Sequence, residues 1–189
     1  MPVVINGWGS ITGLSVGGLP DGSVDADTLA SNAVTAAKLA SGVGGKVQQI
    51  IQSEFSTQTQ VNSSSFVDIG LSATITPSAS SSKILILVFL SVQGSNFYGN
   101  GDTFGFGFNI VRGSTNIADG DSGQHYISVP EEDDYIVFQN PHSRSFLDSP
   151  NTTSATTYKI QGKESNVNAN CQINGSSQKS QLILMEVAA

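Results

Sequence analysis

The residues that could do chemistry in this chain are few and far apart. An acidic run, EEDD, occupies residues 131–134 directly after Pro130. Two of its carboxylates could serve as the acid and base of a glycosidase, and clustered carboxylate oxygens also suit a hard cation. Neighbouring side chains in a loop or strand point apart, however, so a catalytic pair is not expected. We interpret the run as a solvated turn, with cation binding as the alternative.

The segment DGDSG at residues 119–123 looks like the start of a calcium loop. Its twelfth position is Pro130 instead of the required glutamate, so a hairpin turn is the better interpretation. His125 and His142 are the only histidines. Either could bind a metal together with its symmetry mates on a three-fold axis, although a structural role is favoured. We therefore expect no metal and no cofactor.

Cys171 is the only cysteine and stands in the segment NANCQING. One cysteine forms no internal disulfide, and no adjacent base is visible that would make its thiol a nucleophile. The sequence also lacks a G-x-S-x-G motif. We expect a small, half-buried side chain at position 171, and we do not expect an enzyme.

The composition is polar but weakly charged. Of the 189 residues 12% are charged, and the formal net charge is −7. No basic stripe is available to neutralise phosphates, so we expect no nucleic-acid partner. The longest apolar run, residues 84–90, has the length of a strand and not of a membrane span, so we expect no membrane insertion. Such a chain typically hides surface in an assembly or displays uncharged polar strands.

The chain changes character near the glycine pair at residues 44–45. Before it, glycine, alanine and serine abound and apolar residues come singly, so this segment cannot close a core of its own. We predict that residues 1–23 form an arm ordered by partner proteins, with Trp8 as a buried anchor. The predicted docking residues are Val3, Ile5, Trp8, Ile11 and Leu14.

Residues 24–45 contain a weak repeat, because the tripeptide Leu-Ala-Ser at residues 29–31 recurs at residues 39–41. One interpretation is a short amphipathic helix, since alanine is abundant. The other is a thin stalk in which three chains offer aliphatic residues to a common axis; ten-residue spacing fits a helical heptad poorly. We favour helical turns within a three-chain stalk, with contacts at Val24, Leu29, Val34 and Leu39.

From residue 46 to residue 189 the pattern is that of β-strands. Residues 83–93 are almost continuously apolar, which predicts a strand buried on both faces. Residues 103–112 alternate strictly, and the glycine face leaves room for another chain's backbone or a bulky side chain. The large side chains of that strand should form a core or trimer face: Phe104, Phe106, Phe108 and Ile110.

Nine or ten short strands at regular spacing predict an all-β fold, an antiparallel β-sandwich. They include separate strands at residues 134–139 and 144–148, with the turn former Pro141 in the gap between them. The last strand, at residues 180–187, should lie centrally in a sheet. Residues 93–102, rich in glycine and asparagine, are predicted to form a loop that suits ligand recognition or simply closes the end of the sandwich. Its candidate binding residues are Asn96, Phe97, Tyr98 and Asn100.

Two passages resemble proteins of a known family. The stretch GLPDGSVDADTLASNAVTAAKLASG resembles the linker repeats of phage tail fibres, in particular those of phages that infect cyanobacteria and other marine bacteria. Passages from SSSFVDIG at residue 63 to the closing QLILMEV resemble the head module of the same fibres, and the two resemblances together span most of residues 14–187. The motif residues that carry this second resemblance are Phe66, Val67, Asp68, Gly70, Leu71, Ile75, Pro77, Ser82, Lys83, Ile84, Leu85, Arg112, Gly113, Ser114, Thr115, Ile117, Phe146, Leu147, Asp148, Ser149, Pro150, Thr157 and Tyr158.

The resemblance implies a trimeric jelly-roll head of the C1q and tumour-necrosis-factor type, located in the virion. We therefore expect a homotrimeric phage fibre or adhesin subunit. Its arm would dock on tail, baseplate, collar or capsid proteins, and its head would recognise a glycan or protein of the host surface. The alternative is a capsid-decorating or collar fibre with an architectural role only. A glycan-cleaving spike is disfavoured, because no spaced pair of carboxylates is visible.

Overall fold

The computed structural model describes residues 4–5, 11–12, 29–31, 33–35, 38, 46–96, 103–118, 126–128, 136–164 and 170–188. The chain forms two compact units, Met1–Gly44 and Gly45–Ala189. In the first unit, strand β1 (Val4–Ile5) pairs antiparallel with β2 (Ile11–Thr12). Tight turns follow, in which Ala33 N donates to Ala30 O and Lys38 N donates to Thr35 O, each at 2.9 Å. The division at residue 23 stays a prediction.

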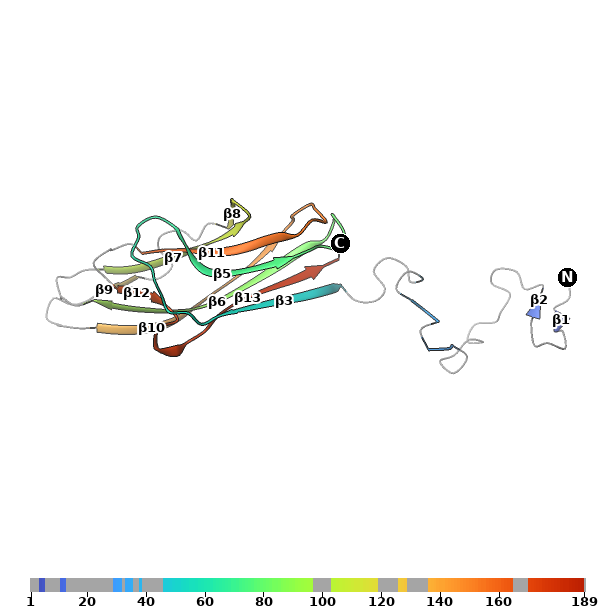
Figure 1. Ribbon diagram of the computed structural model, residues 1–189, viewed down its shortest axis with the longest axis horizontal. Helices are drawn as coiled ribbons and strands as arrows, with labels where there is room; N and C mark the ends of the chain where they lie inside the picture. Colours follow the sequence, from blue (N-terminus) through green and yellow to red (C-terminus); the bar gives the residue numbers. More distant parts are fainter. Residues whose placement is uncertain are drawn as a thin grey trace. The chain divides into compact units, whose positions relative to one another are not determined.

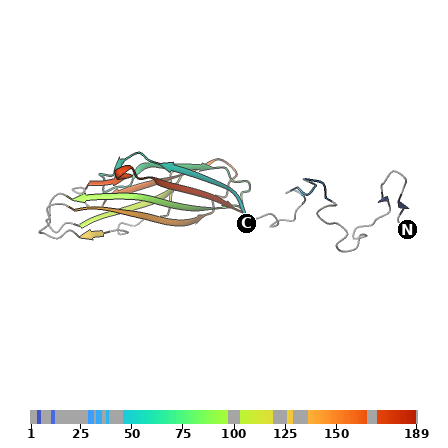
Figure 2. The same cartoon turned by 90° about the horizontal axis from the view of Figure 1, so that it is seen from below.

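The second unit is a sandwich of two antiparallel sheets, which confirms the predicted fold class (Figures 1 and 2). The β6 sheet contains β3 (Val47–Phe55), β4 (Thr59–Gln60), β6 (Lys83–Asn96), β10 (Ile136–Asp148), β12 (Asn170–Ile173) and β13 (Ser180–Val187). The β5 sheet contains β5 (Val67–Ile75), β7 (Thr103–Arg112), β8 (Thr115–Ala118), β9 (Tyr126–Ser128) and β11 (Thr156–Glu164). A short 3-10 helix, η2 (Gly175–Ser177), precedes β13.

Early strands of the sandwich pair with late ones. β3 pairs with β13, β5 with β11, β6 with β10, and β7 with β8. β13 also pairs with β6, so the last strand is central, as predicted. The long strand β6 binds β10 along one side and both β13 and β12 along the other. The sandwich therefore depends mainly on contacts between residues far apart in sequence.

The core fills the space between the two sheets. Alternate residues of each strand point inward, as the two-residue period of a strand requires. Phe106, Phe108 and Ile110 are at most 1% exposed, so the aromatic face of β7 packs inside a single chain. Phe104 lies in β7 with only its backbone described. The glycines of the opposite β7 face, where we expected room for another chain's backbone or a bulky side chain, are also buried within one chain.

Two strand predictions were wrong. Residues 134–139 and 144–148 were expected to form separate strands, but β10 runs through Pro141 without a break. β10 pairs only with β6 among the described strands, and an edge strand tolerates a residue without an N–H. β6 was expected to be buried on both faces. Its second face is open in a single chain, where Leu85 and Leu87 are half-buried and Phe89 is 47% exposed.

Candidate functional site

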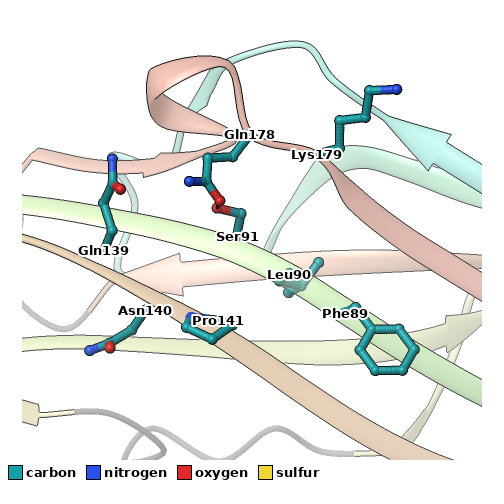
Figure 3. A pocket seen from close by; sticks show the side chains of 8 residues that line it. All are labelled: Phe89, Leu90, Ser91, Gln139, Asn140, Pro141, Gln178 and Lys179. Carbon is teal, nitrogen blue, oxygen red and sulfur yellow. Dashed lines mark hydrogen bonds between the residues drawn. The ribbon is translucent and has the colours of Figure 1, made fainter.

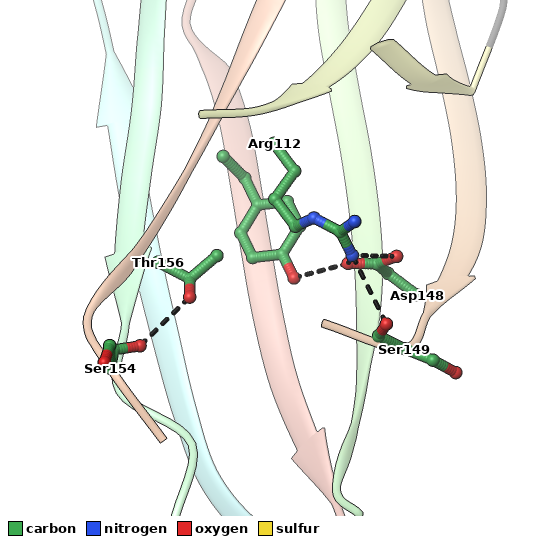
Figure 4. Close-up of polar contacts among 6 residues, drawn as sticks. Arg112, Asp148, Ser149, Ser154 and Thr156 are labelled. Carbon is green, nitrogen blue, oxygen red and sulfur yellow. Dashed lines mark hydrogen bonds and ion pairs between the residues drawn. The ribbon is translucent and has the colours of Figure 1, made fainter. Parts of the chain in front are cut away.

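The clearest polar cluster joins the two sheets through motif residues. Arg112 of β7 donates from Nη1 to both carboxylate oxygens of Asp148 in β10, at 2.9 and 2.8 Å (Figure 4). The hydroxyl of Tyr158 in β11 donates to Asp148 Oδ2 at 2.7 Å. Asp148 is 7% exposed and Tyr158 is fully buried. One carboxylate thus ties the β6 sheet to two strands of the β5 sheet.

The chemistry of this cluster is structural. Burial, together with the hydrogen bond to Asp148, raises the pKa of Tyr158 above its usual value. Arg112 also donates to Ser149 O at 3.3 Å, and Thr156 donates to Ser154 O at 3.0 Å in the connection that follows. The Asp148 carboxylate is occupied by donors, so it offers no base to a substrate.

A second buried carboxylate holds the turn between β5 and β6. Glu186 accepts hydrogen bonds from Ser78 N at 2.7 Å, from Ser78 Oγ at 2.6 Å and from Gln49 Nε2 at 2.6 Å. Burial alone would raise the pKa of Glu186, but these bonds, with one from Ser82, outweigh it and lower the pKa to about 2. Glu186 therefore anchors the turn as a carboxylate at neutral pH.

A third motif cluster lies on the outer face of the β5 sheet. Asp68 accepts hydrogen bonds from Lys159 Nζ at 2.8 Å and from Gln161 Nε2 at 2.7 Å, and these donors lower its pKa. Gly70 has a φ of +94°, and a Cβ there would lie 2.6 Å from Cζ of Phe55. The Asp-x-Gly pattern thus serves strand pairing and close packing.

Glu164 at the end of β11 lacks such partners. Its side chain is fully buried, and neither carboxylate oxygen has a hydrogen-bond partner among the described residues. Burial raises the pKa of Glu164 to about 7. The backbone N–H of Cys171 is near enough to lower the pKa in part, but it does not meet the distance and angle of a hydrogen bond to the carboxylate. Sequence reasoning missed this residue. The alternation of the strand could have revealed it, because Glu164 stands at an even spacing from Tyr158 and Ile160 and therefore points inward with them.

Two further chemically interesting side chains within the described ranges, Cys171 and His142, are buried. Cys171 is buried in β12, more deeply than expected, and burial raises the pKa of its thiol. His142 is 8% exposed, and its ring meets Phe106 edge-on at 5.5 Å. Across the described ranges, no group of three or more His, Cys, Asp or Glu side chains could hold a metal ion. His125, the acidic run and residues 119–123 lie outside those ranges.

The predicted docking, stalk and receptor residues are only partly covered by the described ranges. Ile5 and Ile11 pair between β1 and β2, and Leu29 and Val34 are 43% and 49% exposed. Asn96 ends strand β6 and was wrongly placed in a loop, because β6 pairs with β10 as far as Ile136. The predicted residues outside the described ranges are Val3, Trp8, Leu14, Val24, Leu39, Phe97, Tyr98 and Asn100.

The outer face of the β6 sheet contains a hollow of about 290 Å³ (Figure 3). Phe89 and Ser91 of β6 line it together with Pro141 of β10. Gln178 after η2 accepts a hydrogen bond from Ser91 Oγ at 3.0 Å and closes one side. A second hollow, of about 250 Å³, lies beside Leu87, Phe89 and Ser143. Within the described ranges, no helix has the length and apolar character of a membrane span.

Comparison with known proteins adds little. No family model matches the sequence, and no curated protein matches it. Among solved structures, a chain from the structure of infectious bursal disease virus, Gx strain, superposes with a TM-score of 0.34 and 13% sequence identity. The match covers 75% of this chain and 37% of that chain. A similarity this low carries no argument about function.

Proposed function

We propose that this chain is a non-enzymatic structural subunit of a virus particle, a homotrimeric fibre-type protein of a phage. Its first unit docks on other virion proteins, and its sandwich is the head. The observation that carries the proposal is where the motif residues lie. Arg112, Asp148 and Tyr158, which resemble positions of phage-fibre heads, are the residues that bind one sheet to the other.

Strand pairing supports the jelly-roll part of the proposal. A jelly roll contains eight strands in two Greek keys. Folding a long hairpin over itself pairs its first strand with its last and its middle strands with each other. The pairs β3–β13, β5–β11, β6–β10 and β7–β8 follow that order.

The use of polar residues supports a structural role over catalysis. Among the described residues, the carboxylates of Asp148, Glu186 and Asp68 are each engaged by donors from neighbouring strands. The same observation favours a second candidate function, a capsid-decorating or collar fibre whose head only spaces or stabilises. The two candidates differ in whether the head binds the host surface.

Electron microscopy of purified particles tests the proposal. A dense tag fused after β13 should mark a fibre or a surface projection, and a chain absent from purified particles would contradict the proposed function. Purified protein added to host cells then separates the candidates. Competition with phage adsorption supports host recognition, whereas unchanged adsorption with fragile head-deleted particles supports the architectural role.

A further inference from the structure

The outer face of the β6 sheet carries an apolar row from edge to edge. Met185 of β13 lies opposite Ile50 of β3 on one side and opposite Leu85 of β6 on the other. Leu85 in turn lies opposite Leu147 of β10. Ile50 is 58% exposed and Leu147 is 50% exposed, while the two middle residues are half-buried. Directly opposed residues of antiparallel strands point to the same face, so this row is continuous.

Adjacent rows extend the apolar surface. Ile183 lies opposite Leu87, and Val187 lies between Val47 and the exposed Lys83, which borders the apolar surface. Of the exposed large apolar side chains in the sandwich, Val67 belongs to the β5 sheet. The others all belong to strands of the β6 sheet: Val47, Ile50, Phe89, Val137 and Leu147. Contiguous apolar surface of this kind marks an interaction site in a soluble protein.

The outer face of the β5 sheet is different. Thr74 and Thr157 share a hydrogen bond of 2.8 Å across β5 and β11. Next to them, Lys159 and Gln161 bind Asp68. These side chains suit water, whereas the apolar row on the β6 sheet does not. The difference indicates that burial against another surface would stabilise the outer face of the β6 sheet but not that of the β5 sheet.

We infer that the outer face of the β6 sheet is the surface through which copies of this chain meet in the homotrimer. The Ile50 edge of one copy packs beside the Leu147 edge of the next. Such a head-to-tail contact closes into a ring when the rotation suits it. The inference rests on the trimer in the proposed function and names the surface that forms it.

The distribution of charge favours a second copy of this chain as the partner that binds the outer face of the β6 sheet. The chain carries a net charge of −7, so copies repel one another unless they meet where charge is absent. The row from Ile50 to Leu147 and the neighbouring row of Gln52, Ile183, Leu87 and Ser145 contain no charged side chain. A strongly acidic or basic partner would find no complementary group in these rows.

The relief of the surface also suits close packing. Phe89 borders both hollows described above, so its half-exposed ring forms a ridge between two depressions. Small outward residues of β10, Ser143 and Ser145, leave room beside it. A ridge of one copy can enter a depression of another, as tight protein interfaces require.

The path of the chain agrees with this arrangement. The first unit joins the sandwich at Lys46, where Ala188 N donates to Lys46 O at 2.7 Å. The pair Val47 and Val187 lies immediately next to this junction, at one end of the apolar surface. Copies that meet through this surface bring their junctions together, as a three-chain stalk requires.

The test is the mass of the full-length protein by analytical ultracentrifugation. Wild type should sediment at three times the chain mass of 19.6 kDa. The double variant Ile50→Glu/Leu147→Glu should sediment at one chain mass, because both side chains are exposed and the charges oppose contact without entering the core. Ser72→Glu, an exposed site on the β5 sheet, is the matched control and should stay trimeric.

Circular dichroism shows whether each variant keeps its strands, and Ile50→Ser/Leu147→Ser replaces the charged pair if it does not. A monomeric wild type would overturn the inference. If the charged double variant stays trimeric, the β6 face is not the trimer interface. The proposed virion role would remain intact, because tagging of particles tests that role separately. Loss of the trimer in Ser72→Glu as well would show that the β6 face has no special part.

Discussion

Replacing Glu164 by glutamine should remove a pH-dependent loss of stability from the sandwich. The carboxyl group is fully buried, and neither of its oxygens is hydrogen-bonded within the described residues. Burial raises its pKa from the ordinary 4.5 to about 7. Ionised Glu164 is therefore unfavourable in the folded state, and the protonated acid is tolerated.

The sign follows from proton binding. Because the folded state binds this proton more tightly than the unfolded state, the stabilisation is fully present below pH 4.5 and is lost as the pH rises through about 7. Each pKa unit corresponds to about 1.4 kcal/mol. Between pH 5 and pH 8 the wild type should therefore lose on the order of 2.5 kcal/mol through Glu164.

Urea titration followed by circular dichroism measures the effect at pH 5, 6, 7 and 8. Protein concentration is held fixed, because assembly also contributes to stability. The thiol of Cys171 on β12 interacts electrostatically with Glu164, and it remains in Glu164→Gln. The difference between the two proteins therefore isolates Glu164. The Glu164→Gln variant should be no more stable than wild type at pH 5 and more stable than wild type at pH 8.

Parallel stability curves for the two proteins would refute this reasoning. They would mean that the Glu164 carboxyl is solvated or paired in solution, so that its charge costs nothing. Any constant deficit of the variant in such parallel curves would come from the changed shape of the side chain and not from its charge.

Further substitutions test the framework contacts. Glu186→Gln should cost about 2 kcal/mol of folding stability at pH 7 by urea titration, because charge-assisted hydrogen bonds to the carboxylate are lost. Because the pKa of Glu186 is near 2 in the folded state, this stabilisation is present above about pH 4.5 and is lost as the pH falls through 2. A stability deficit of the variant that is undiminished at pH 3 would contradict the assignment. Asp148→Ala should cost about 3 kcal/mol in thermal denaturation, because it removes the partner of the buried Tyr158 hydroxyl and of the partly buried Arg112 guanidinium. Tyr158→Phe should cost about 1 kcal/mol, and equal losses would show that the ion pair is unimportant. Gly70→Ala should cost well over 1 kcal/mol by urea titration, because its Cβ would lie 2.6 Å from an aromatic ring carbon at a φ of +94°. Gly113→Ala, with a φ of +59° and open space, should cost only about 1 kcal/mol, and a similar cost at both sites would contradict the steric argument.

Alternation along single strands was predictable from sequence, because a strand displays its burial directly as a period of two. Phe106, Phe108 and Ile110 illustrate this. Strand β6 shows the limit of the same reasoning. An apolar residue such as Leu85 on the second face indicates that the face is covered, but not whether the cover comes from the same chain.

Contacts between distant strands were not predictable. Arg112, Asp148 and Tyr158 were each noted as motif residues, yet their meeting depends on the registers of β7, β10 and β11. Pro141 was misinterpreted as a strand boundary, because proline stops a central strand but is accepted in an edge strand. Both the meeting of these three side chains and the acceptance of Pro141 depend on which strands lie side by side in the folded protein.

The pairing of β3 with β13 determines when folding can finish on the ribosome. Val47 lies opposite Val187, so β3 finds its described partner strand only after almost the whole sandwich has been translated. Until then the nascent chain exposes the apolar stretch of β6, which is a hazard for aggregation. Release of β13 is therefore the event that commits the polypeptide to its native state, and chains truncated before it should be cleared by proteases instead of folding.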